Sequence, residues 1–303
     1  MLVSIIIVSY NVCGELDECI NSIFQVLKNI EFEILVVDNN SPDRKVENLQ
    51  QKYPNAKFYF LNENLGFSMA NNYAVQKSKS KYILILNPDT KFTEDFITPI
   101  IQFIENHDNV GACSPMLLNQ DLTYQNSAGN RMGFFYEAAE ALFYINFYRK
   151  FKKSLNHKKY KRKEPFKVGW MSGACLLLKR DIYNEVNGFN IEYFLNYEDL
   201  DFCNKIRDKG YSNFYFPYLR CIHLDQTSQK RDYEAFVFSR YKSRIIYSNN
   251  HYSLTKRFLV RIIHIIGLLL RMIFVNITYS GKEKSQRRKG YGKSLMLYIG
   301  ITQ

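Results

Sequence analysis

An α/β fold with a doubly wound, mostly parallel sheet is predicted by two features of the first 120 residues. Short apolar runs alternate with helical segments, and polar turn residues follow several of these runs directly. The first run, Leu2–Val8, is rich in β-branched residues, which is typical of a strand covered on both faces. Because such alternation joins parallel strands by right-handed crossovers, it predicts helices on both faces of one sheet.

The elements follow from the period of the apolar residues. Glu15–Leu27 carries its apolar residues at helical spacing, whereas Tyr82–Leu86 is a short apolar run that ends at a proline-containing turn. The expected strands are Leu2–Val8, Phe32–Val37, Lys57–Leu61, Tyr82–Leu86, Val110–Leu118, Val168–Leu178 and Tyr211–Phe216. The expected helices are Glu15–Leu27, Ser68–Gln76, Thr93–Asn106 and Asp199–Lys209.

Polar side chains stand where several of these strands end. Asp38, Asn64 and Asp89 follow the second, third and fourth strands. Since ligands bind such sheets beyond the carboxyl ends of the strands, these positions predict a binding site. Asp38 also suits the simpler role of a helix cap.

Charge is distributed unevenly along the 303 residues, whose formal net charge is +12. Residues 149–163 hold nine Lys/Arg and no Asp/Glu, and residues 230–303 hold 15 Lys/Arg and three Asp/Glu. This asymmetry predicts an anionic partner, which could be a membrane surface, a phosphorylated substrate or a nucleic acid. Residues 149–163 lack periodicity and are expected to form a mobile loop or a solvated linker.

The chain is expected to divide at residue 229. Residues 1–229 would form the catalytic domain, and residues 230–303 a basic, amphipathic helical tail. Within the tail, the long apolar segment Phe258–Tyr279 carries a basic stripe along one helical face, made of Arg257, Arg261, His264 and Arg271. A basic stripe opposite an apolar face suits a helix lying in a membrane interface better than a spanning helix. The alternative is a helix packed on the enzyme body or on a second subunit.

The cysteines and the N-terminus favour a cytoplasmic protein. The six cysteines form no C-x-x-C pair and several lie in apolar runs, where a free thiol behaves as a small hydrophobe. The N-terminal apolar run has no basic residues before it and ends at Val8, so it reads as a strand and not as a signal peptide.

An acidic cluster at Glu198, Asp199 and Asp201 is the most informative stretch of the chain, and a histidine, His223, follows it. Burial among aromatic residues and crowding of like charges both raise carboxyl pKa values. Proteins tolerate that mostly where a proton must be moved or a cation held. The cluster could otherwise be a solvated helix start, since acids favour first turns.

These motifs together resemble glycosyltransferase family 2, which are inverting enzymes with a nucleotide-sugar-binding GT-A fold. The resemblance covers about residues 2–225 and is closest to the bacterial rhamnosyltransferase-like branch. The segments that carry it are Val3–Asn11, Val36–Asp43, Asn64–Phe67, Leu86–Asp89, Gly173–Cys175, Gly188–Phe189 and Glu198–Asp199.

The resemblance implies a role for each matching residue. Asp199 would be the catalytic base, and Asp89 with His223 would hold Mg²⁺ or Mn²⁺ against the diphosphate. Glu198, Asp201 and Trp170 are expected around the acceptor or the sugar. The residues expected at the nucleotide sugar are Ser9, Tyr10, Asn11, Asp38, Asn64, Gly66 and Asn87. Simpler readings remain for His223, as a hydrogen-bonded strand-end histidine, and for Trp170, as part of the core.

The chemistry of glycosyl transfer explains these residue types. A divalent cation neutralises a departing nucleoside diphosphate, and because it also binds the phosphates, few protein ligands suffice. The acceptor hydroxyl must lose a proton as it attacks, and one base is enough for a single inverting displacement.

The sequence departs from the family pattern in two places. The metal motif Asn87-Pro88-Asp89 has one acid where the family has two, and Asn190 stands where an aspartate is usual. The first departure bears on metal affinity, and the second on contacts to sugar or acceptor hydroxyls.

The expected function is therefore inverting transfer of a sugar, with rhamnose as first choice, from a dTDP- or UDP-sugar. The acceptor would be a glycan or lipid-linked glycan of cell-surface polysaccharide biosynthesis. The enzyme would sit in the cytoplasm, on an anionic membrane surface. One alternative is a nucleotidyltransferase, but Ser9–Leu16 lacks a basic phosphate-binding residue. Another is a non-enzymatic nucleic-acid-binding protein. The bases of the tail lie beside aliphatic residues and not on an aromatic surface, so nucleic acid is not the expected partner.

Overall fold

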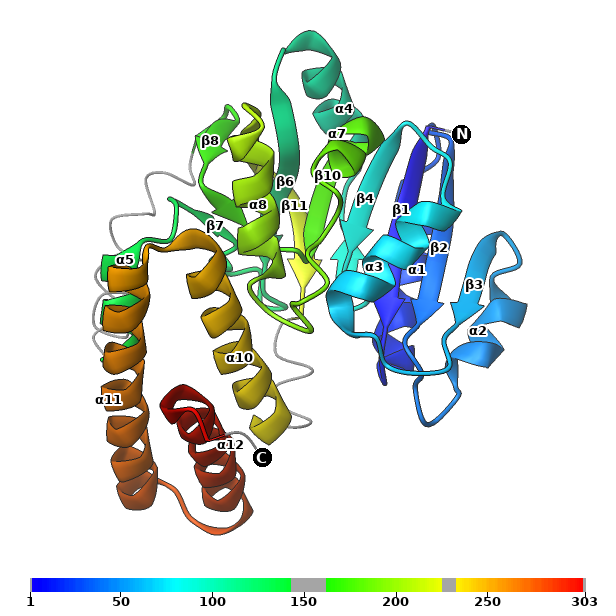
Figure 1. The fold of residues 1–303 in the computed structure, drawn as a ribbon. Helices are drawn as coiled ribbons and strands as arrows, with labels where there is room; N and C mark the ends of the chain where they lie inside the picture. The colour runs from blue at the N-terminus through cyan, green and yellow to red at the C-terminus, as the bar shows by residue number, and fades with distance from the viewer. Residues whose placement is uncertain (1, 143–161, 225–232, 302–303) are drawn as a thin grey trace. The chain divides into compact units, whose positions relative to one another are not determined.

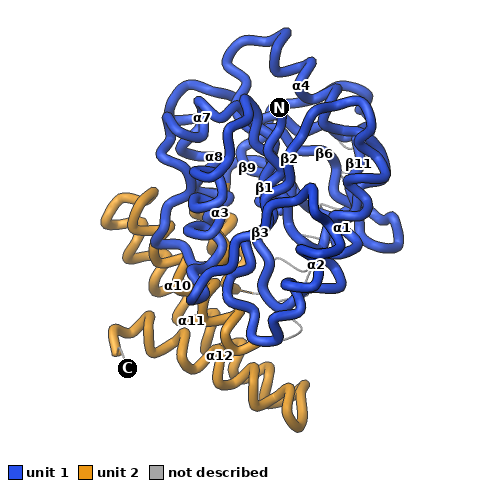
Figure 2. The backbone as a smooth tube through the Cα atoms, turned by 90° about the vertical axis from the view of Figure 1, so that its right-hand side faces the viewer, with its two compact units in different colours: residues 1–131, 161–194, 198–225 blue, residues 132–160, 195–197, 226–303 orange. Residues whose placement is uncertain are grey.

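The computed structural model describes residues 2–142, 162–224 and 233–301. The chain forms two compact units (Figure 2). The first consists of residues 1–131, 161–194 and 198–225, and the second of residues 132–160, 195–197 and 226–303. Residues 149–161 of the expected mobile loop lie outside the described residues. The division at residue 229 stays a prediction.

The first unit is built on one mixed sheet whose strand order is β3-β2-β1-β4-β10-β6-β11-β5, with β8 also paired to β11 (Figure 1). A small second sheet pairs β7 with β9. The strands are β1 Val3–Ser9, β2 Phe32–Asp38, β3 Ala56–Phe60, β4 Tyr82–Leu86, β5 Thr90–Phe92, β6 Val110–Leu118, β7 Ala128–Gly129, β8 Phe166–Val168, β9 Trp170–Met171, β10 Cys175–Lys179 and β11 Ser212–His223.

The parallel part of the sheet, β3-β2-β1-β4, brings polar strand ends to one edge. Ser9 lies directly opposite Asp38 in the β1–β2 register, and Ile7 lies opposite Leu86 in the β1–β4 register. All the residues of β1 and β4 are buried, as expected for strands covered on both faces. The strand ends of β1, β2 and β4 therefore share one edge of the sheet.

Helices cover both faces of this sheet (Figure 1). Alternate β1 residues such as Ile5 share a core with Ile20 of α1 and Ile100 of α4, while α3 packs against β1 and β2. The helices of the first unit are α1 Cys13–Val26, α2 Val46–Lys52, α3 Gly66–Lys77, α4 Ile97–Asn106, α7 Arg180–Glu185 and α8 Glu198–Asp208. The α/β class, the central sheet and the C-terminal helices agree with the sequence prediction.

Several elements differ from their predicted form. The strand expected at Tyr211–Phe216 extends from Ser212 to His223. Apart from Val168, which ends β8, the single strand expected at Val168–Leu178 is divided into β9 and β10, with Ser172–Ala174 between them. The helix expected from Thr93 begins at Ile97, because the Asp95 carboxylate accepts the N–H groups of Ile97 and Thr98. Strand β10 runs antiparallel to β4 and β6, so the sheet is mostly but not wholly parallel.

The second unit contains α5 Phe134–Ala141, α10 Tyr233–His251, α11 Leu254–Thr278 and α12 Gly281–Ile299. Its apolar core joins the last three helices through residues such as Val237, Leu268 and Tyr298. Among the described residues, α11 is the one helix long and apolar enough to cross a membrane by length and composition.

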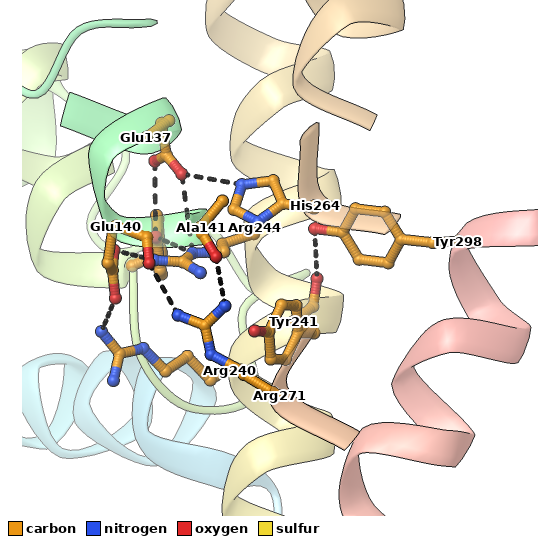
Figure 3. A network of polar contacts seen from close by, with 10 residues as sticks. Glu137, Glu140, Ala141, Arg240, Tyr241, Arg244, His264, Arg271 and Tyr298 are labelled. Atoms are coloured by element: carbon orange, nitrogen blue, oxygen red, sulfur yellow. Dashed lines mark hydrogen bonds and ion pairs between the residues drawn. The ribbon is translucent and has the colours of Figure 1, made fainter. Parts of the chain in front are cut away.

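Buried ion pairs and hydrogen bonds join α5 to α10 and α11 (Figure 3). Glu137 of α5 accepts a hydrogen bond from His264 Nε2 at 3.1 Å and lies 3.6 Å from Arg244. Glu140 pairs with both Arg240 and Arg244. Breaking one buried ion pair leaves an uncompensated charge, which costs about 3–5 kcal/mol, so this network fixes which face of α11 meets α5.

Candidate active site

The loops after β1 and β2 are held together by one serine. Asp38, nearly buried at the end of β2, accepts both the Ser41 hydroxyl at 2.5 Å and the Ser41 N–H at 3.0 Å. The Asn11 N–H donates to the same Ser41 Oγ at 2.9 Å. Asn11 itself has a left-handed backbone with φ 59°, a conformation that asparagine adopts more readily than most residues. Ser41 therefore fixes Asn11 and Asp38 with respect to each other.

Ser9, the last residue of β1, and Tyr10, which follows it, differ in exposure. The Ser9 hydroxyl is fully buried and has no hydrogen-bond partner among the described residues. The Tyr10 side chain is 45% exposed. A buried hydroxyl without a partner is uncommon and marks a place where a ligand or water would be favourable.

Asn39, which the sequence analysis did not single out, organises the next turn. Its side chain donates to Asn64 Oδ1 at 2.8 Å and to the Gly66 carbonyl at 3.2 Å, and it accepts the Leu65 N–H at 2.8 Å. Gly66 has φ 76°, which glycine adopts without strain. The turn Asn64–Gly66 is thus tied to the end of β2, where Asp38 lies.

The Asn87–Asp89 turn after β4 meets the end of β11. His223 Nε2 lies 3.3 Å from Asp89 Oδ1 and 3.2 Å from Asn87 Nδ2. On the other side of the ring, His223 Nδ1 lies 2.8 Å from Gln125 Oε1. Gln125 was not predicted from the sequence, because its only local signal is a polar residue in a loop 98 positions before His223.

The surroundings of His223 orient its ring. Because Gln125 Oε1 can only accept, the Nδ1–H group donates to it, and Nε2 is the ring nitrogen that faces Asp89. A carboxylate oxygen and an imidazole nitrogen then converge, which is a donor set that suits Mn²⁺. The described residues contain no group of three or more His, Cys, Asp or Glu arranged to hold a metal. The pair fits a cation whose remaining ligands are phosphate oxygens and water.

The acidic cluster forms the first turn of α8, and its three carboxylates have different surroundings. Glu198 and Asp201, three residues apart on one helical face, are almost fully buried, whereas Asp199 is partly exposed. Asp199 Oδ2 accepts the Gly173 N–H at 3.1 Å and Oδ1 accepts the Leu200 N–H at 2.8 Å. Of the three, Asp199 is the carboxylate that a substrate can reach.

Burial controls the protonation of this cluster. It raises the pKa of Glu198 well above its usual range, and the adjacent Asp199 charge raises it further. Burial also raises the pKa of Asp199, but the Gly173 and Leu200 N–H groups oppose that shift by binding the ionised form. Glu198 therefore holds a proton more firmly than Asp199, and Asp199 is the member available as a base.

The residues before α8 have an unusual backbone. Asn196 and Tyr197 have φ values of 67° and 71°, consecutive left-handed conformations that cost about 1–3 kcal/mol each. Such strain is frequent where a functional side chain must be aimed. Here it directly precedes Glu198 and Asp199.

The segment Gly173-Ala174 connects the Asn87–Asp89 turn to Asp199. The Asn87 N–H donates to the Ala174 carbonyl at 2.9 Å, and the neighbouring Gly173 N–H donates to Asp199. Asp199 and the Asn87–Asp89 turn are therefore bonded to two adjacent residues.

Trp170 and Asp201 have structural partners. Trp170 is half-buried in β9, and its indole lies against Gly129 of β7, where a Cβ atom would come within 2.7 Å of Nε1. Asp201 Oδ1 accepts the Tyr193 hydroxyl at 3.4 Å. Their place beside acceptor or sugar stays a prediction.

The comparisons with known proteins identify the class of enzyme. A sequence model of Glycosyl transferase family 2 matches residues 4–186. The chain belongs to this family, and it is a glycosyltransferase with a GT-A fold. This assignment decides for glycosyl transfer over the alternative of nucleotidyl transfer.

Two sequence relatives carry rhamnosyltransferase names, which agrees with the branch predicted. One is the N-acetylglucosaminyl-diphospho-decaprenol L-rhamnosyltransferase of Mycobacterium tuberculosis, 24% identical over 241 residues that cover 73% of this chain and 75% of the relative. The other is rhamnosyltransferase WbbL of Escherichia coli, 26% identical over 199 residues that cover 62% of this chain and 72% of the relative.

A solved structure shows the same fold. It is the mannosyltransferase PcManGT from Pyrobaculum calidifontis, in complex with GDP-Man and Mn²⁺. The TM-score is 0.57 at 14% sequence identity, and the match covers 99% of this chain and 86% of that chain.

Proposed function

We propose that this enzyme transfers a sugar, with inversion, from a nucleoside diphosphate sugar to a glycan or lipid-linked glycan of cell-surface polysaccharide biosynthesis. Rhamnose from dTDP-rhamnose is the first candidate, because two relatives are named rhamnosyltransferases and one acts on a lipid-linked diphosphate sugar. A UDP-sugar is the second. The observation that carries the proposal is Asp199, the one partly exposed carboxylate of the cluster in the first turn of α8, which is bonded to the same short segment as the Asn87–Asp89 turn.

The nucleotide would lie along the ends of β1 and β2. Asp38 would accept hydrogen bonds from the base or ribose, with its carboxylate held in place by Ser41. Tyr10 has the exposed ring needed to stack on a base. The Ser9 hydroxyl, which has no hydrogen-bond partner among the described residues, would bond to the nucleotide. Asn11, Asn64, Gly66 and Asn87 are proposed to complete the contacts around the sugar and diphosphate.

Asp89 and His223 are proposed to hold Mn²⁺ or Mg²⁺, with Mn²⁺ favoured by the imidazole nitrogen. Such a cation would neutralise the charge on the departing diphosphate. Gln125 orients the His223 ring by accepting the Nδ1 hydrogen. Asn87 donates toward the same ring nitrogen, so it would have to turn that amide toward the diphosphate when a cation binds.

Asp199 is proposed as the base. It would take the proton of the acceptor hydroxyl while that oxygen attacks the anomeric carbon and the bond from that carbon to the phosphate oxygen breaks. The nucleoside diphosphate leaves with the electron pair, and the configuration inverts. A double displacement would need a second ionised carboxylate at the sugar, and Glu198 and Asp201 are buried. Glu198, Asp201 and Trp170 are instead proposed to shape the pocket for acceptor or sugar.

We also propose a cytoplasmic enzyme bound to the inner face of the cell membrane, with residues 1–229 catalytic and residues 230–303 as the attachment. The apolar, basic composition of α11 and α12 supports this location.

The test combines donor choice with metal dependence. Nucleotide sugars are screened for hydrolysis and for protection against heating, and calorimetry measures nucleoside diphosphate binding with and without Mn²⁺. We expect Mn²⁺ to tighten binding in the natural enzyme, and Asp89→Ala and His223→Ala to remove most of that gain. Asp108→Ala, an exposed aspartate before β6, is the matched control. If Mn²⁺ and Mg²⁺ both leave wild-type binding unchanged, the metal role is wrong for both residues.

A further inference from the structure

Part of the basic stripe of helix α11 is used differently from the expectation. The basic stripe was predicted to face anionic headgroups. In the structure, His264 is 1% exposed and bonded to Glu137, and Arg271 donates to the carbonyl groups of Ala141 and Glu140 (Figure 3). Arg261 donates to the Tyr298 carbonyl of α12. His264 and Arg271 therefore hold α11 to α5, and Arg261 holds it to α12.

Close packing confirms which side of α11 faces inward. Gly267 lies against α5 so closely that a Cβ atom would come 2.3 Å from the Ala141 oxygen. Leu268 and Val275, on the same side, are buried in the core of the second unit. The side of α11 that carries His264, Gly267, Leu268 and Val275 is thus enclosed by other helices of the second unit.

The outward side of α11 is aliphatic and aromatic along its whole length. This outward face consists of large apolar residues with exposed fractions between 38% and 79%, at helical spacing: Phe258, Ile262, Ile266, Leu269, Ile273 and Ile277. At 3.6 residues per turn they occupy an arc of about 100°, over a helix about 37 Å long. Soluble monomers rarely expose one contiguous apolar surface of this extent, so the outward face is expected to meet an apolar partner.

The charge of the helices indicates which partner. Helix α11 contains four Lys/Arg and no Asp/Glu, and α12 contains six Lys/Arg and one Glu. Lys256, Lys282, Arg288 and Lys289 are exposed. An apolar helix face accompanied by exposed bases matches a bilayer with acyl chains beneath anionic headgroups. It matches a second copy of the same basic surface less well, because like charges would meet.

The contacts of α11 with α5 indicate how the helix would be oriented in a membrane. A helix crossing the bilayer is surrounded by lipid or by other spanning segments, and α5, with Glu137 and Glu140, is bonded along one side of α11. If α11 crossed the bilayer, these carboxylates and their arginine partners would enter the hydrocarbon region, which has a large free-energy cost. A helix lying in the plane of the interface leaves that side in contact with protein.

We propose that α11 lies in the plane of an anionic membrane surface with its outward face among the acyl chains, and that exposed bases of α11 and α12 contact the headgroups. This deepens the membrane location proposed above. Its test measures lipid binding and not sugar transfer. A negative result would therefore contradict the membrane orientation without contradicting the proposed glycosyl transfer.

The experiment is vesicle flotation of the full chain with phosphatidylcholine alone and with added phosphatidylglycerol, at low and high salt. We expect binding to the anionic vesicles, weakened but not abolished by high salt. The variant Leu269→Ser/Ile273→Ser should lower the partition coefficient at least about tenfold. The control Phe60→Ser/Leu122→Ser removes two exposed apolar residues of the first unit and should bind as the natural chain does. Unchanged thermal unfolding shows that both variants fold.

Four results would overturn the proposal. One is a natural chain that does not float with anionic vesicles, and another is equal flotation of the Leu269/Ile273 variant and its control. The third is resistance of the membrane-bound chain to alkaline carbonate extraction, which would mean that α11 spans the bilayer. Sedimentation without lipid decides whether a second copy covers the face: a dimer that dissociates in the Leu269/Ile273 variant would replace the membrane by a partner subunit.

Discussion

Replacing Asp199 by asparagine tests the assignment of the base, because the exchange keeps the shape and removes the function. Both carboxylate oxygens accept a backbone N–H, from Gly173 at 3.1 Å and from Leu200 at 2.8 Å. An asparagine has one acceptor oxygen and one donor group, so one of these N–H groups must find another partner.

Asp199→Asn is expected to have two opposing effects on stability and one large effect on turnover. An unsatisfied buried N–H costs about 1–3 kcal/mol, but Asp199 is partly exposed and water can take over, so we expect the lower end. Removing a carboxylate whose charged form is disfavoured by burial offsets part of that loss. Loss of general-base help should reduce turnover about 10²–10⁴-fold.

The assay measures turnover at saturating donor and acceptor, together with thermal unfolding and nucleoside diphosphate binding. Asp208→Asn, an exposed residue at the other end of α8, is the matched control. The natural enzyme should lose activity as the pH falls, because the base must be ionised, and the acid limb should lie above pH 3.8 since burial raises the Asp199 pKa. Turnover of Asp199→Asn within threefold of the natural enzyme would remove Asp199 from the role of base.

Two further predictions concern stability. Burial lowers the pKa of His264 below its usual value of 6.5, although the hydrogen bond to Glu137 opposes this shift. The unfolded chain therefore binds more protons than the folded chain, and the stability falls as the pH drops below 6.5. The free energy of unfolding should fall by up to about 1 kcal/mol between pH 6.5 and 5.5. Thermal unfolding of His264→Gln should depend less on pH over this range. If the pH dependence is unchanged in this variant, His264 is not the group responsible. Gly66→Ala should lower the urea midpoint by the equivalent of about 2–4 kcal/mol, because φ is 76° and a Cβ would lie 2.6 Å from the Phe194 carbonyl oxygen. The control Gly14→Ala, in a helix with open space around it, should leave stability unchanged or raise it.

The strand ends were predictable because their signals are local. A buried strand needs a continuous apolar run, and the polar residue that ends it is visible beside it, as with Asp38 after β2. The same holds for Asp199, whose acidic neighbours and helical period place it in the first turn of α8.

The supporting residues of the site were not predictable in this way. Gln125 contacts His223 across 98 positions, and Ser41 binds Asn11 across 30. A single glutamine or serine in a loop carries no period and no spacing, so nothing near it in the sequence indicates its partner. The division of Val168–Leu178 into two strands likewise depends on pairing, since β9 joins β7 whereas β10 joins β4 and β6.

Local sequence patterns were enough to predict most strands of the central sheet, the acids at the strand ends, and the two-faced character of α11. Period and composition decide these properties because they act over a few residues. Which face of α11 turns inward depends on contacts that are distant in the sequence, because the basic stripe could face water or polar groups of α5 equally well. Glu137, more than a hundred positions away, binds His264, and the backbone carbonyls of Glu140 and Ala141 bind Arg271, so this side of the helix turns inward and large apolar residues are left outside.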